Sequence, residues 1–283
     1  MPGALPQPIG NRKMIRLALL NLMPDKDVTE ANFARAFAKA EEPVEFVLTK
    51  MKSHVSKHRS EHDGLYVDSV EMRKRHDSGD CPVDGFVFSG APFDYVWFDD
   101  VDYWPEACEL MDWLRERSIP TLYVCWGAQA ALHHFYGISR YEEYVVKLSG
   151  VYPQQISEPL HPLFEGIAEP LCIPHSRHTT MTNAEIDHHP AIRVLARSER
   201  SGISIAENTD GTELYLVGHQ EYALDTLDKE YHRDIERGEN VQVPEHYYEN
   251  DNPALPVVNS WQDNGQRMFS NWLNYMIRQR GNR

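Results

Sequence analysis

The first half of the chain alternates short apolar runs with segments of helical spacing, and this alternation restricts the fold more than any other feature. The strand-like runs are 14–22, 44–49, 84–89 and 120–125, and the helical segments are 29–39, 105–117 and 128–135. Strands separated by helices are typical of a parallel sheet that helices cover. We therefore predict an α/β fold with a mostly parallel sheet flanked by helices.

The rest of the chain extends this pattern without a visible domain boundary. Residues 50–80 are polar, contain scattered glycine and histidine, and are predicted to form an irregular excursion. The second half holds shorter strand-like pieces and two helical stretches, at 192–196, 202–206, 213–217, 226–236 and 266–278. Since no linker rich in glycine, serine or proline divides them, we predict an N-terminal tail over residues 1–13 and a single domain over residues 14–283.

The charge of the chain restricts its partners. The 283 residues include 43 Asp and Glu but 28 Lys and Arg, a formal net charge of −15. A field of this sign repels nucleic acid and anionic lipid, so we expect neither as a partner. The longest apolar run is too short to cross a bilayer, and the N-terminus lacks a signal-peptide pattern. We therefore expect a cytoplasmic protein without contact to a membrane.

Neither the cysteines nor the histidines form a pattern typical of a metal site. The four cysteines are widely spaced and include no C-x-x-C pair, which argues against a disulfide framework and a zinc–thiolate site. His54, His58 and His62 are spaced by four residues, but polar residues and Gly64 surround them. A zinc site needs a further converging ligand and supporting groups. We interpret this stretch as a solvated loop and expect no metal.

Cys125 is the strongest candidate for a reacting group. It ends an apolar run directly before a helical segment, which predicts a place at the carboxyl edge of the sheet, where open α/β sheets bind ligands. A helix N-terminus stabilises a thiolate, and the N–H of Trp126 can form half of an oxyanion hole. A buried, inert core cysteine is the alternative interpretation. The other cysteines lack this context and are interpreted as packing or surface thiols: Cys81, Cys108 and Cys172.

A base for this thiol is predicted at the end of a later strand. His219 and Glu221 follow the apolar run 213–217 and stand two residues apart, so in an extended chain both project from one side. Glu221 would orient the imidazole while His219 takes the thiol proton, although a surface pair is the alternative. The small residues at 90–92 would let the backbone N–H of Ala91 act as the second oxyanion donor, unless they form a plain tight turn.

Eight motifs together carry a resemblance to a known family. They are NLMPDK at 21–26, SGAP at 89–92, VDYWP at 101–105, CWGAQAA at 125–131, KLSGVY at 147–152, PHSRH at 174–178, GHQEY at 218–222 and NWLNY at 271–275. Over residues 14–280 the chain resembles the homoserine O-succinyltransferase family, which includes homoserine O-acetyltransferases. The resemblance implies a class I glutamine amidotransferase-like fold, a homodimer and a place in methionine biosynthesis. It also implies ping-pong acyl transfer from acetyl-CoA or succinyl-CoA to homoserine through a cysteine thioester, without a permanently bound cofactor.

The resemblance also implies roles for individual residues. Cys125 would be the nucleophile, His219 the base and Glu221 its partner. Three further positions match residues with which the family binds substrate: Lys147, Ser176 and Arg233. The chain departs from the family at Gln220, where proline is usual, and at Gly127, where many members have alanine.

The choice of donor and acceptor stays open within this resemblance. The position two after Gly-Ala-Pro tends to be glycine in family members that use succinyl-CoA and glutamate in those that use acetyl-CoA; here it is Asp94. A carboxylate near the acyl pocket would repel the free carboxylate of a succinyl group, so we predict a preference for acetyl-CoA, unless Asp94 only caps a turn. Serine, one methylene shorter, is the alternative acceptor. A cysteine hydrolase or glutaminase on the same scaffold is the alternative activity.

Overall fold

The computed structural model of the protein describes residues 14–54, 60–93 and 95–281. Its centre is a ten-stranded sheet of order β3-β2-β1-β4-β5-β10-β9-β8-β6-β7. The parallel part consists of β3 (Val67–Asp68), β2 (Val44–Lys50), β1 (Ile15–Leu20), β4 (Gly85–Phe88), β5 (Thr121–Val124) and β10 (Glu213–Leu216). The antiparallel part consists of β9 (Gly202–Asn208), β8 (Ile192–Ser198), β6 (Arg140–Ile156) and β7 (Leu171–Met181).

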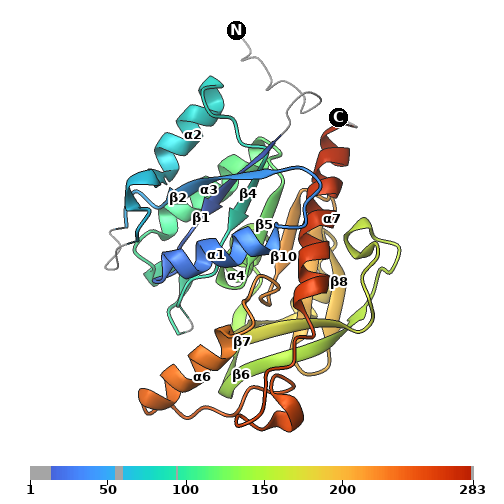
Figure 1. Cartoon of the computed structure of the whole chain (residues 1–283). Helices are drawn as coiled ribbons and strands as arrows, with labels where there is room; N and C mark the ends of the chain where they lie inside the picture. Colours follow the sequence, from blue (N-terminus) through green and yellow to red (C-terminus); the bar gives the residue numbers. More distant parts are fainter. Residues whose placement is uncertain (1–13, 55–59, 94, 282–283) are drawn as a thin grey trace.

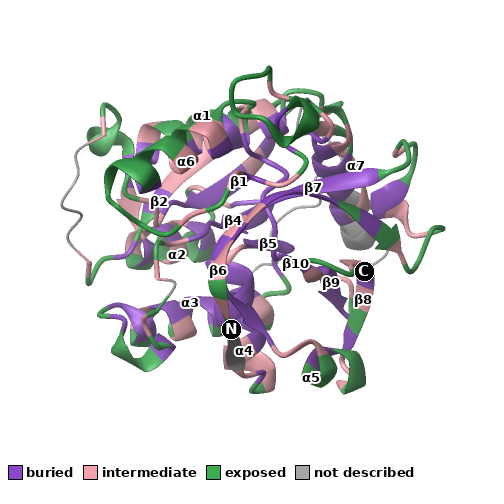
Figure 2. Cartoon of the chain, turned by 90° about the horizontal axis from the view of Figure 1, so that it is seen from below, coloured by how far each residue is buried: buried purple, intermediate pink, exposed green. Residues whose placement is uncertain are grey.

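The inner parallel strands are buried on both faces. Every residue of β4, β5 and β10 is buried, and Figure 2 shows these strands as the buried centre of the molecule. Short continuous apolar runs are typical of such strands, because helices on both faces exclude water. The predicted α/β class with a mostly parallel sheet is confirmed.

Helices cover both faces of this sheet (Figure 1). One face is covered by α1 (Lys26–Ala36) and α7 (Gln262–Gly281), and the other by α2 (Ser69–Ser78), α3 (Trp104–Glu116), α4 (Trp126–Tyr136) and α5 (Asn183–His188). Phe33 of α1 and Phe37, which follows α1, contact the ring of Phe269 of α7 edge to face. The ring centroids lie 6.4 Å from Phe269 for Phe33 and 4.9 Å for Phe37. Sheet and helices form three layers. Because the strands of the parallel part run in the same direction, their carboxyl ends share one edge of the sheet.

Two segments near the N-terminus differ from the sequence-based expectation. Residues 50–80 are not irregular throughout, because β3 and α2 lie within them. α2 gives a weak sequence signal, since it buries little more than Met72 and His76 and is otherwise mostly polar. α1 begins before the predicted helical segment 29–39, because the side chain of Asp25 accepts from the Val28 N–H and caps the first turn.

The second half contains a longer antiparallel ribbon than the short pieces predicted there. β6 pairs with β8 at Gln155 and Ile156, and with β7 along most of its length. Nearly every residue of β7 is buried, so the sequence shows no alternation from which its length could be predicted. The β6–β7 register shifts between Glu143 and Leu148, and Lys147 lies in this irregular stretch.

α6 (Thr226–Glu236) lies beside the ribbon of β6 and β7, away from the main helical layers (Figure 1). A small separate core supports it, made of Val151, Cys172, Tyr222, Leu227, Tyr247, Tyr248 and Trp261. This core is much smaller than the two clusters on the faces of the sheet.

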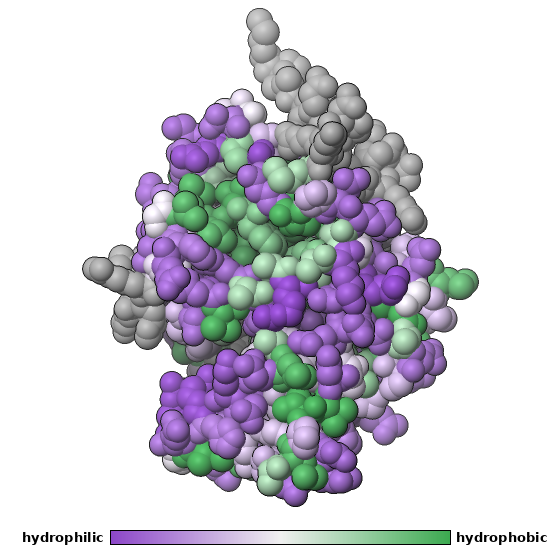
Figure 3. Space-filling model, viewed as in Figure 1, coloured by the Kyte–Doolittle hydropathy of each residue, from purple (hydrophilic) through white to green (hydrophobic). Residues whose placement is uncertain are grey.

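The face of the molecule that is seen in the view of Figure 1 has a mostly hydrophilic surface (Figure 3). Figure 3 shows one group of hydrophobic side chains in the upper half of this view, where Figure 1 draws β1 and β2, and a second group in the lower half. β2 carries half-buried Val44, Phe46 and Leu48, which pack against the cluster beneath α1 and α7. Among the described residues, no helix is both long enough and apolar enough to cross a membrane.

Candidate active site

Cys125 lies at the turn where β5 ends and α4 begins. Its backbone has φ +51° and ψ −114°, a conformation that residues other than glycine rarely adopt. Two hydrogen bonds hold it: the Cys125 N–H donates to the Leu216 carbonyl at 2.7 Å, and the Cys125 carbonyl accepts from the Gln129 N–H at 3.1 Å. The half-buried thiol therefore stands at the start of a helix, where the first backbone N–H groups have no partner within the helix.

The turn is tight because α4 starts directly against the segment that follows β4. A Cβ atom at Gly127 would lie 2.8 Å from the Ser89 carbonyl oxygen and 2.9 Å from that of Phe88. Tyr123 occupies the position where such turns often have glycine. Its ring is buried and stacks on Tyr215, with centroids 5.6 Å apart. The core thus accommodates this tyrosine, and the turn forms without the glycine.

His219 and Glu221 lie beside the thiol. Glu221 Oε1 lies 2.7 Å from His219 Nδ1, and Cys125 lies close enough to His219 for its charge to raise the pKa of the imidazole. Because an ionised carboxylate only accepts hydrogen bonds, we assign the proton of this contact to Nδ1. Nε2 is then the nitrogen that exchanges a proton with the thiol. The structure brings the three predicted residues together, with the imidazole and the carboxylate buried.

The charges around His219 favour its protonated form. Burial is the largest influence and lowers the pKa of His219, but Cys125 and Glu221, through their charges and hydrogen bonds, raise that pKa well above its usual range. An imidazolium beside a cysteine stabilises the thiolate, which is the nucleophilic form. The arrangement is therefore suited to covalent attack by the sulfur on a carbonyl carbon.

The segment that follows β4 lies against this group. A Cβ atom at Gly90 would lie 3.2 Å from Cys125 Cβ and 3.8 Å from both Cys125 Sγ and His219 Cε1. Ala91 follows Gly90 in the chain, and Trp126 follows Cys125 as the first residue of α4. The two residues predicted to supply oxyanion donors thus adjoin the thiol from two different segments.

A cluster of opposite charges lies between α6 and the β6–β7 ribbon. Lys147 Nζ lies 2.7 Å from Asp234 Oδ2 and 3.6 Å from Glu230 Oε2, and Arg233 Nη2 lies 2.6 Å from Asp234 Oδ1. Burial raises the pKa of Asp234, but Lys147 and Arg233 outweigh it and hold that pKa below its usual range. The Ser176 hydroxyl donates to Glu230. The three predicted substrate-binding residues therefore meet in one cluster around two carboxylates.

Tyr222 connects the thiol group to this cluster. Its ring stacks on the imidazole of His219, with 4.1 Å between centroids and 16° between planes, and its hydroxyl donates to Glu230 Oε1 at 3.1 Å. Sequence reasoning missed Tyr222, Glu230 and Asp234. Tyr222 had one signal, its place directly after the His-x-Glu pair. Glu230 and Asp234 stand four residues apart on a helix with many charged residues, a pattern that equally suits a solvated surface.

Two of the other cysteines lie in surroundings that suppress reactivity. Burial, followed by the charges of Asp112 and Asp99, raises the pKa of Cys108 to about 11. Burial also raises the pKa of Cys172. A thiol with a raised pKa carries little thiolate at neutral pH and reacts slowly. These environments contrast with the imidazole beside Cys125.

Two residues singled out from the sequence lie outside the described residues. Asp94, on which the prediction of donor choice rests, is one of them, and His58 is the other. Of the remaining histidines in that series, His54 is half-buried and its Nδ1 lies 2.9 Å from Asp102 Oδ2. His54 thus takes part in a surface ion pair when it is protonated.

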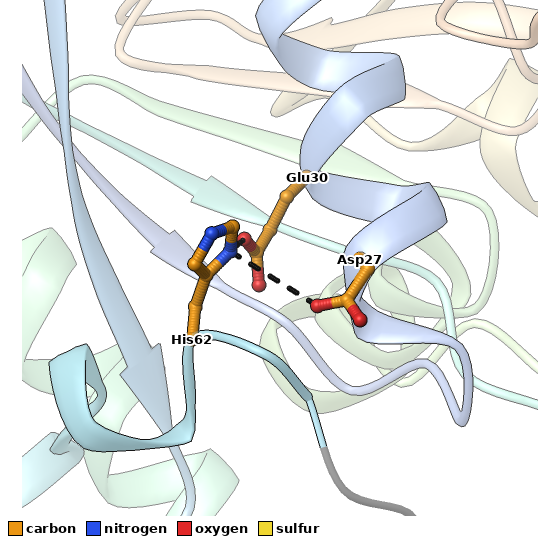
Figure 4. Close-up of side chains that lie close together, drawn as sticks. All are labelled: Asp27, Glu30 and His62. Carbon is orange, nitrogen blue, oxygen red and sulfur yellow. Dashed lines mark hydrogen bonds and ion pairs between the residues drawn. The ribbon is translucent and has the colours of Figure 1, made fainter.

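His62 belongs to a grouping with Asp27 and Glu30 whose ligand atoms converge (Figure 4). His62 Nδ1 lies 2.6 Å from Glu30 Oε2 and 4.0 Å from Asp27 Oδ1. The hydroxyl of Ser60 donates to Asp27, and that of Tyr66 donates to Glu30. The hydrogen bond to Glu30 and its charge raise the pKa of His62. These hydrogen bonds and ion pairs account for the grouping, so we assign no metal to it.

Comparison with known proteins relates this architecture to a family. A family model described as homoserine O-succinyltransferase matches residues 8–283. A homoserine O-acetyltransferase of Brevibacillus brevis is 37% identical over 94% of this chain and 85% of its own length. A homoserine O-acetyltransferase of Bacteroides fragilis is 38% identical over the same shares of the two chains.

Solved structures show the same fold at low sequence identity. A glutamine amidotransferase from Thermotoga maritima matches with a TM-score of 0.61 and 13% identity, over 93% of this chain and 98% of that chain. A glutamine amidotransferase from Methylobacillus flagellatus matches with a TM-score of 0.56 and 11% identity, over 93% of this chain and 95% of that chain. The predicted likeness to the fold of class I glutamine amidotransferases is confirmed.

Proposed function

Because the chain belongs to the homoserine O-succinyltransferase family, we propose that it transfers an acyl group from acyl-CoA to the hydroxyl of homoserine through a thioester on Cys125. The observation that carries this proposal is the Cys125–His219–Glu221 group at the start of α4, joined to a cluster of opposite charges. A Cys–His–Glu group alone also suits a hydrolase. The adjoining cluster favours an amino-acid acceptor, which carries an ammonium and a carboxylate.

The first half-reaction moves the acyl group to the protein. The Cys125 thiolate attacks the thioester carbonyl of acyl-CoA, and a C–S bond to Cys125 forms. The backbone N–H groups of Ala91 and Trp126 stabilise the negative oxygen of the tetrahedral intermediate. As the intermediate collapses, the C–S bond to CoA breaks and the His219 imidazolium gives its proton to the leaving CoA sulfur. Glu221 holds the imidazole by its Nδ1 proton throughout.

The second half-reaction moves the acyl group to the acceptor. His219, now neutral, takes the proton of the homoserine hydroxyl while the oxygen attacks the acyl carbon on Cys125. A C–O bond forms, the bond from the acyl carbon to Cys125 Sγ breaks, and the sulfur leaves as a thiolate. The imidazolium beside this thiolate restores the starting state, so both half-reactions use the same two side chains.

The charged cluster is suited to hold the acceptor. It contains two cations and two carboxylates within ion-pair distance, and this mixture matches a zwitterion better than a simple anion. Arg233 is the more exposed of the two cations and has the fork geometry for a carboxylate, which Lys147 can support. Glu230 suits the ammonium, and the Ser176 hydroxyl can bond a polar group of the acceptor.

For the donor we propose acetyl-CoA in preference to succinyl-CoA. Relatives named homoserine O-acetyltransferase share 34–38% identity with this chain, although the family model carries the name of the succinyl enzyme. The carboxylate of Asp94 supports the same choice, by its sequence position. Asp94→Gly is expected to raise the use of succinyl-CoA relative to acetyl-CoA.

We further propose a homodimer that works in the cytoplasm, as the family resemblance implies. Both statements concern the whole protein in its cell and are open to direct measurement. Size-exclusion chromatography with light scattering gives the mass in solution, for which we expect twice the 32.7 kDa of one chain. Cell fractionation gives the compartment.

A matrix of donors and acceptors tests the proposed activity. CoA release is measured with acetyl-CoA or succinyl-CoA against homoserine or serine, and ammonia release is measured with glutamine as a hydrolase control. We expect the highest kcat/KM for acetyl-CoA with homoserine and no glutamine hydrolysis. Glutamine hydrolysis without acyl transfer would contradict the proposal. A higher kcat/KM with succinyl-CoA would contradict only the donor assignment.

A further inference from the structure

Tyr222 touches both parts of the site through different atoms. Its ring covers the imidazole of His219, and its hydroxyl bonds Glu230 in the charged cluster. We propose that Tyr222 is a positioning residue that couples occupancy of the acceptor site at Glu230 to the orientation of the His219 imidazole. This inference rests on the proposed function, and it assigns Tyr222 a role in the second half-reaction.

The ring fixes the plane of the base. Glu221 holds the His219 imidazole at one nitrogen only, which leaves rotation about that hydrogen bond. A ring stacked at 4.1 Å and 16° removes this freedom. Tyr222 is itself anchored, because its carbonyl accepts from Trp261 Nε1 at 3.1 Å and its N–H donates to the His219 carbonyl at 3.2 Å. The stack therefore holds the imidazole toward Cys125.

The hydroxyl provides the link to the acceptor site. Burial, followed by the charge of Glu230, raises the pKa of Tyr222 well above its usual range, so the hydroxyl keeps its proton and donates it. Glu230 also accepts from Ser176 and lies 3.6 Å from Lys147 Nζ. An acceptor ammonium at Glu230 redistributes these bonds, and Tyr222 transmits the change to the ring on His219. The hydroxyl thus matters when the acceptor binds, whereas the ring matters in both half-reactions.

The test measures the two half-reactions separately. Tyr222→Phe keeps the ring and removes the bond to Glu230. Thioester formation is followed by CoA release from acetyl-CoA alone, and deacylation by loss of the thioester after homoserine is added. We expect thioester formation within about twofold of wild type and deacylation by homoserine slowed about tenfold, as for the loss of one hydrogen bond to a charged group. Hydrolysis of the thioester by water is expected to stay unchanged.

The matched control is Tyr248→Phe. Tyr248 is also buried and donates to a carboxylate of α6, Asp228, at 2.5 Å, but it belongs to neither the thiol group nor the charged cluster. This variant is expected to leave both half-reactions unchanged. Tyr222→Leu, which removes the ring, is expected to slow both half-reactions about tenfold or more. Circular dichroism and the Tm of each variant show whether it is folded.

The outcomes separate this inference from the proposed function. If the wild-type protein forms no thioester with acetyl-CoA, the proposed function fails. If the wild-type protein forms it and Tyr222→Phe deacylates normally, the coupling through the hydroxyl is wrong. Equal slowing of both half-reactions in Tyr222→Phe, or the same slowing in Tyr248→Phe, would also overturn the inference, because a purely structural effect explains it.

Discussion

Cys125 combines a reactive side chain with a strained backbone. A φ of +51° costs a non-glycine residue on the order of 1–3 kcal/mol. The surrounding hydrogen bonds hold the backbone in this conformation. The strain places the sulfur between the start of α4 and His219, where both a helix N-terminus and an imidazole stabilise negative charge. Function and stability therefore oppose each other at this position.

This opposition predicts an unusual order of stability between two variants. The free energy of unfolding of Cys125→Gly is expected to be about 1 kcal/mol higher than that of Cys125→Ala, because glycine adopts this backbone conformation without strain. Cys125→Gly should therefore unfold at a higher urea concentration. At an ordinary position glycine is the less stable of the two. Urea denaturation followed by fluorescence measures the difference. A more stable alanine variant would show that the backbone at Cys125 is not strained.

The partnership of His219 and Glu221 predicts a graded loss of activity. His219→Ala is expected to lower kcat/KM by at least about 100-fold, the usual contribution of a general base. Glu221→Gln is expected to lower it less, because the imidazole stays. His134→Ala, which removes an imidazole paired with Asp112 on α3, serves as a control and is expected to stay active. Equal and negligible losses from both site variants would point to a different base.

The substitution Glu221→Gln is also expected to shift the pH profile of thioester formation. The charge of Glu221 raises the pKa of His219, so its removal lowers that pKa. Thioester formation needs the imidazolium as the acid for the CoA sulfur, and it declines as pH rises through this pKa. The descending limb of its pH profile is therefore expected at lower pH in Glu221→Gln than in wild type. A shift to higher pH would contradict this assignment.

At the scale of elements, the segment that follows β10 positions the base by packing against β7, where the His219 N–H donates to the Pro174 carbonyl at 2.8 Å. A Cβ atom at Gly218 would lie 2.3 Å from Ile173 Cγ2 and 2.9 Å from His175 Cε1, so β7 leaves no room for a side chain at this position. Since His219 is the next residue, any displacement of this contact moves the base. The close approach of the Gly218 backbone to β7 is thus part of the site.

Gly218→Ala is therefore expected to lower the free energy of unfolding by about 1–3 kcal/mol, the usual effect of overpacking, and to lower kcat/KM as well. Gly64→Ala is the matched control, because a Cβ atom there would have nothing within 4 Å. Its unfolding free energy is expected to change by less than about 0.5 kcal/mol. Urea denaturation and the CoA-release assay measure both variants. Equal behaviour of the two would contradict the close packing of Gly218 on β7.

The elements differ in how well the sequence predicted them. The inner strands β4, β5 and β10 were predictable, because strands buried on both faces read as short apolar runs. The helix α2 was missed, because most of its residues are polar or charged. The length of β7 was missed, because a strand buried along most of its length shows no alternation.

At the scale of the whole molecule, the site unites parts that are stabilised unequally. Large apolar clusters support the sheet on both faces, whereas α6 rests on a small core and buries only Leu227 and Asp234 along its length. Segments with fewer buried contacts open more often than the core. The thiol thus lies at the end of a well-supported strand, whereas Glu230, Arg233 and Asp234 of the charged cluster lie on the less supported α6.

Hydrogen exchange followed by mass spectrometry tests this contrast. Amides of β4, β5 and β10 are expected to exchange slowest, and those of α6 to exchange faster by at least about tenfold. Homoserine is expected to slow exchange in α6 and leave the central strands unchanged, because in the proposed binding mode it bridges Arg233 and Glu230. Exchange in α6 as slow as in β5 would contradict the unequal support.

The two parts of the site also differ in predictability. Cys125, His219 and Glu221 were predictable as a group, because strand ends and a two-residue spacing are visible in a sequence. Glu230 and Asp234 were not, because burial of a charged helix residue depends on what packs against the helix. The cation that pairs with such a carboxylate, here Lys147 with Asp234, lies far away in the sequence and is brought near only by the fold.

The proposed mechanism requires a covalent acyl group on Cys125, which intact mass spectrometry detects. The protein is mixed with acetyl-CoA alone, without an acceptor, and its mass is measured before and after homoserine is added. We expect one acetyl group on the wild-type chain, lost again with homoserine, and none on Cys125→Ala, whose turnover is expected to be essentially abolished. An acetyl group on Cys125→Ala to the same extent as on the wild-type chain, or turnover by that variant near the wild-type rate, would contradict the covalent mechanism through Cys125.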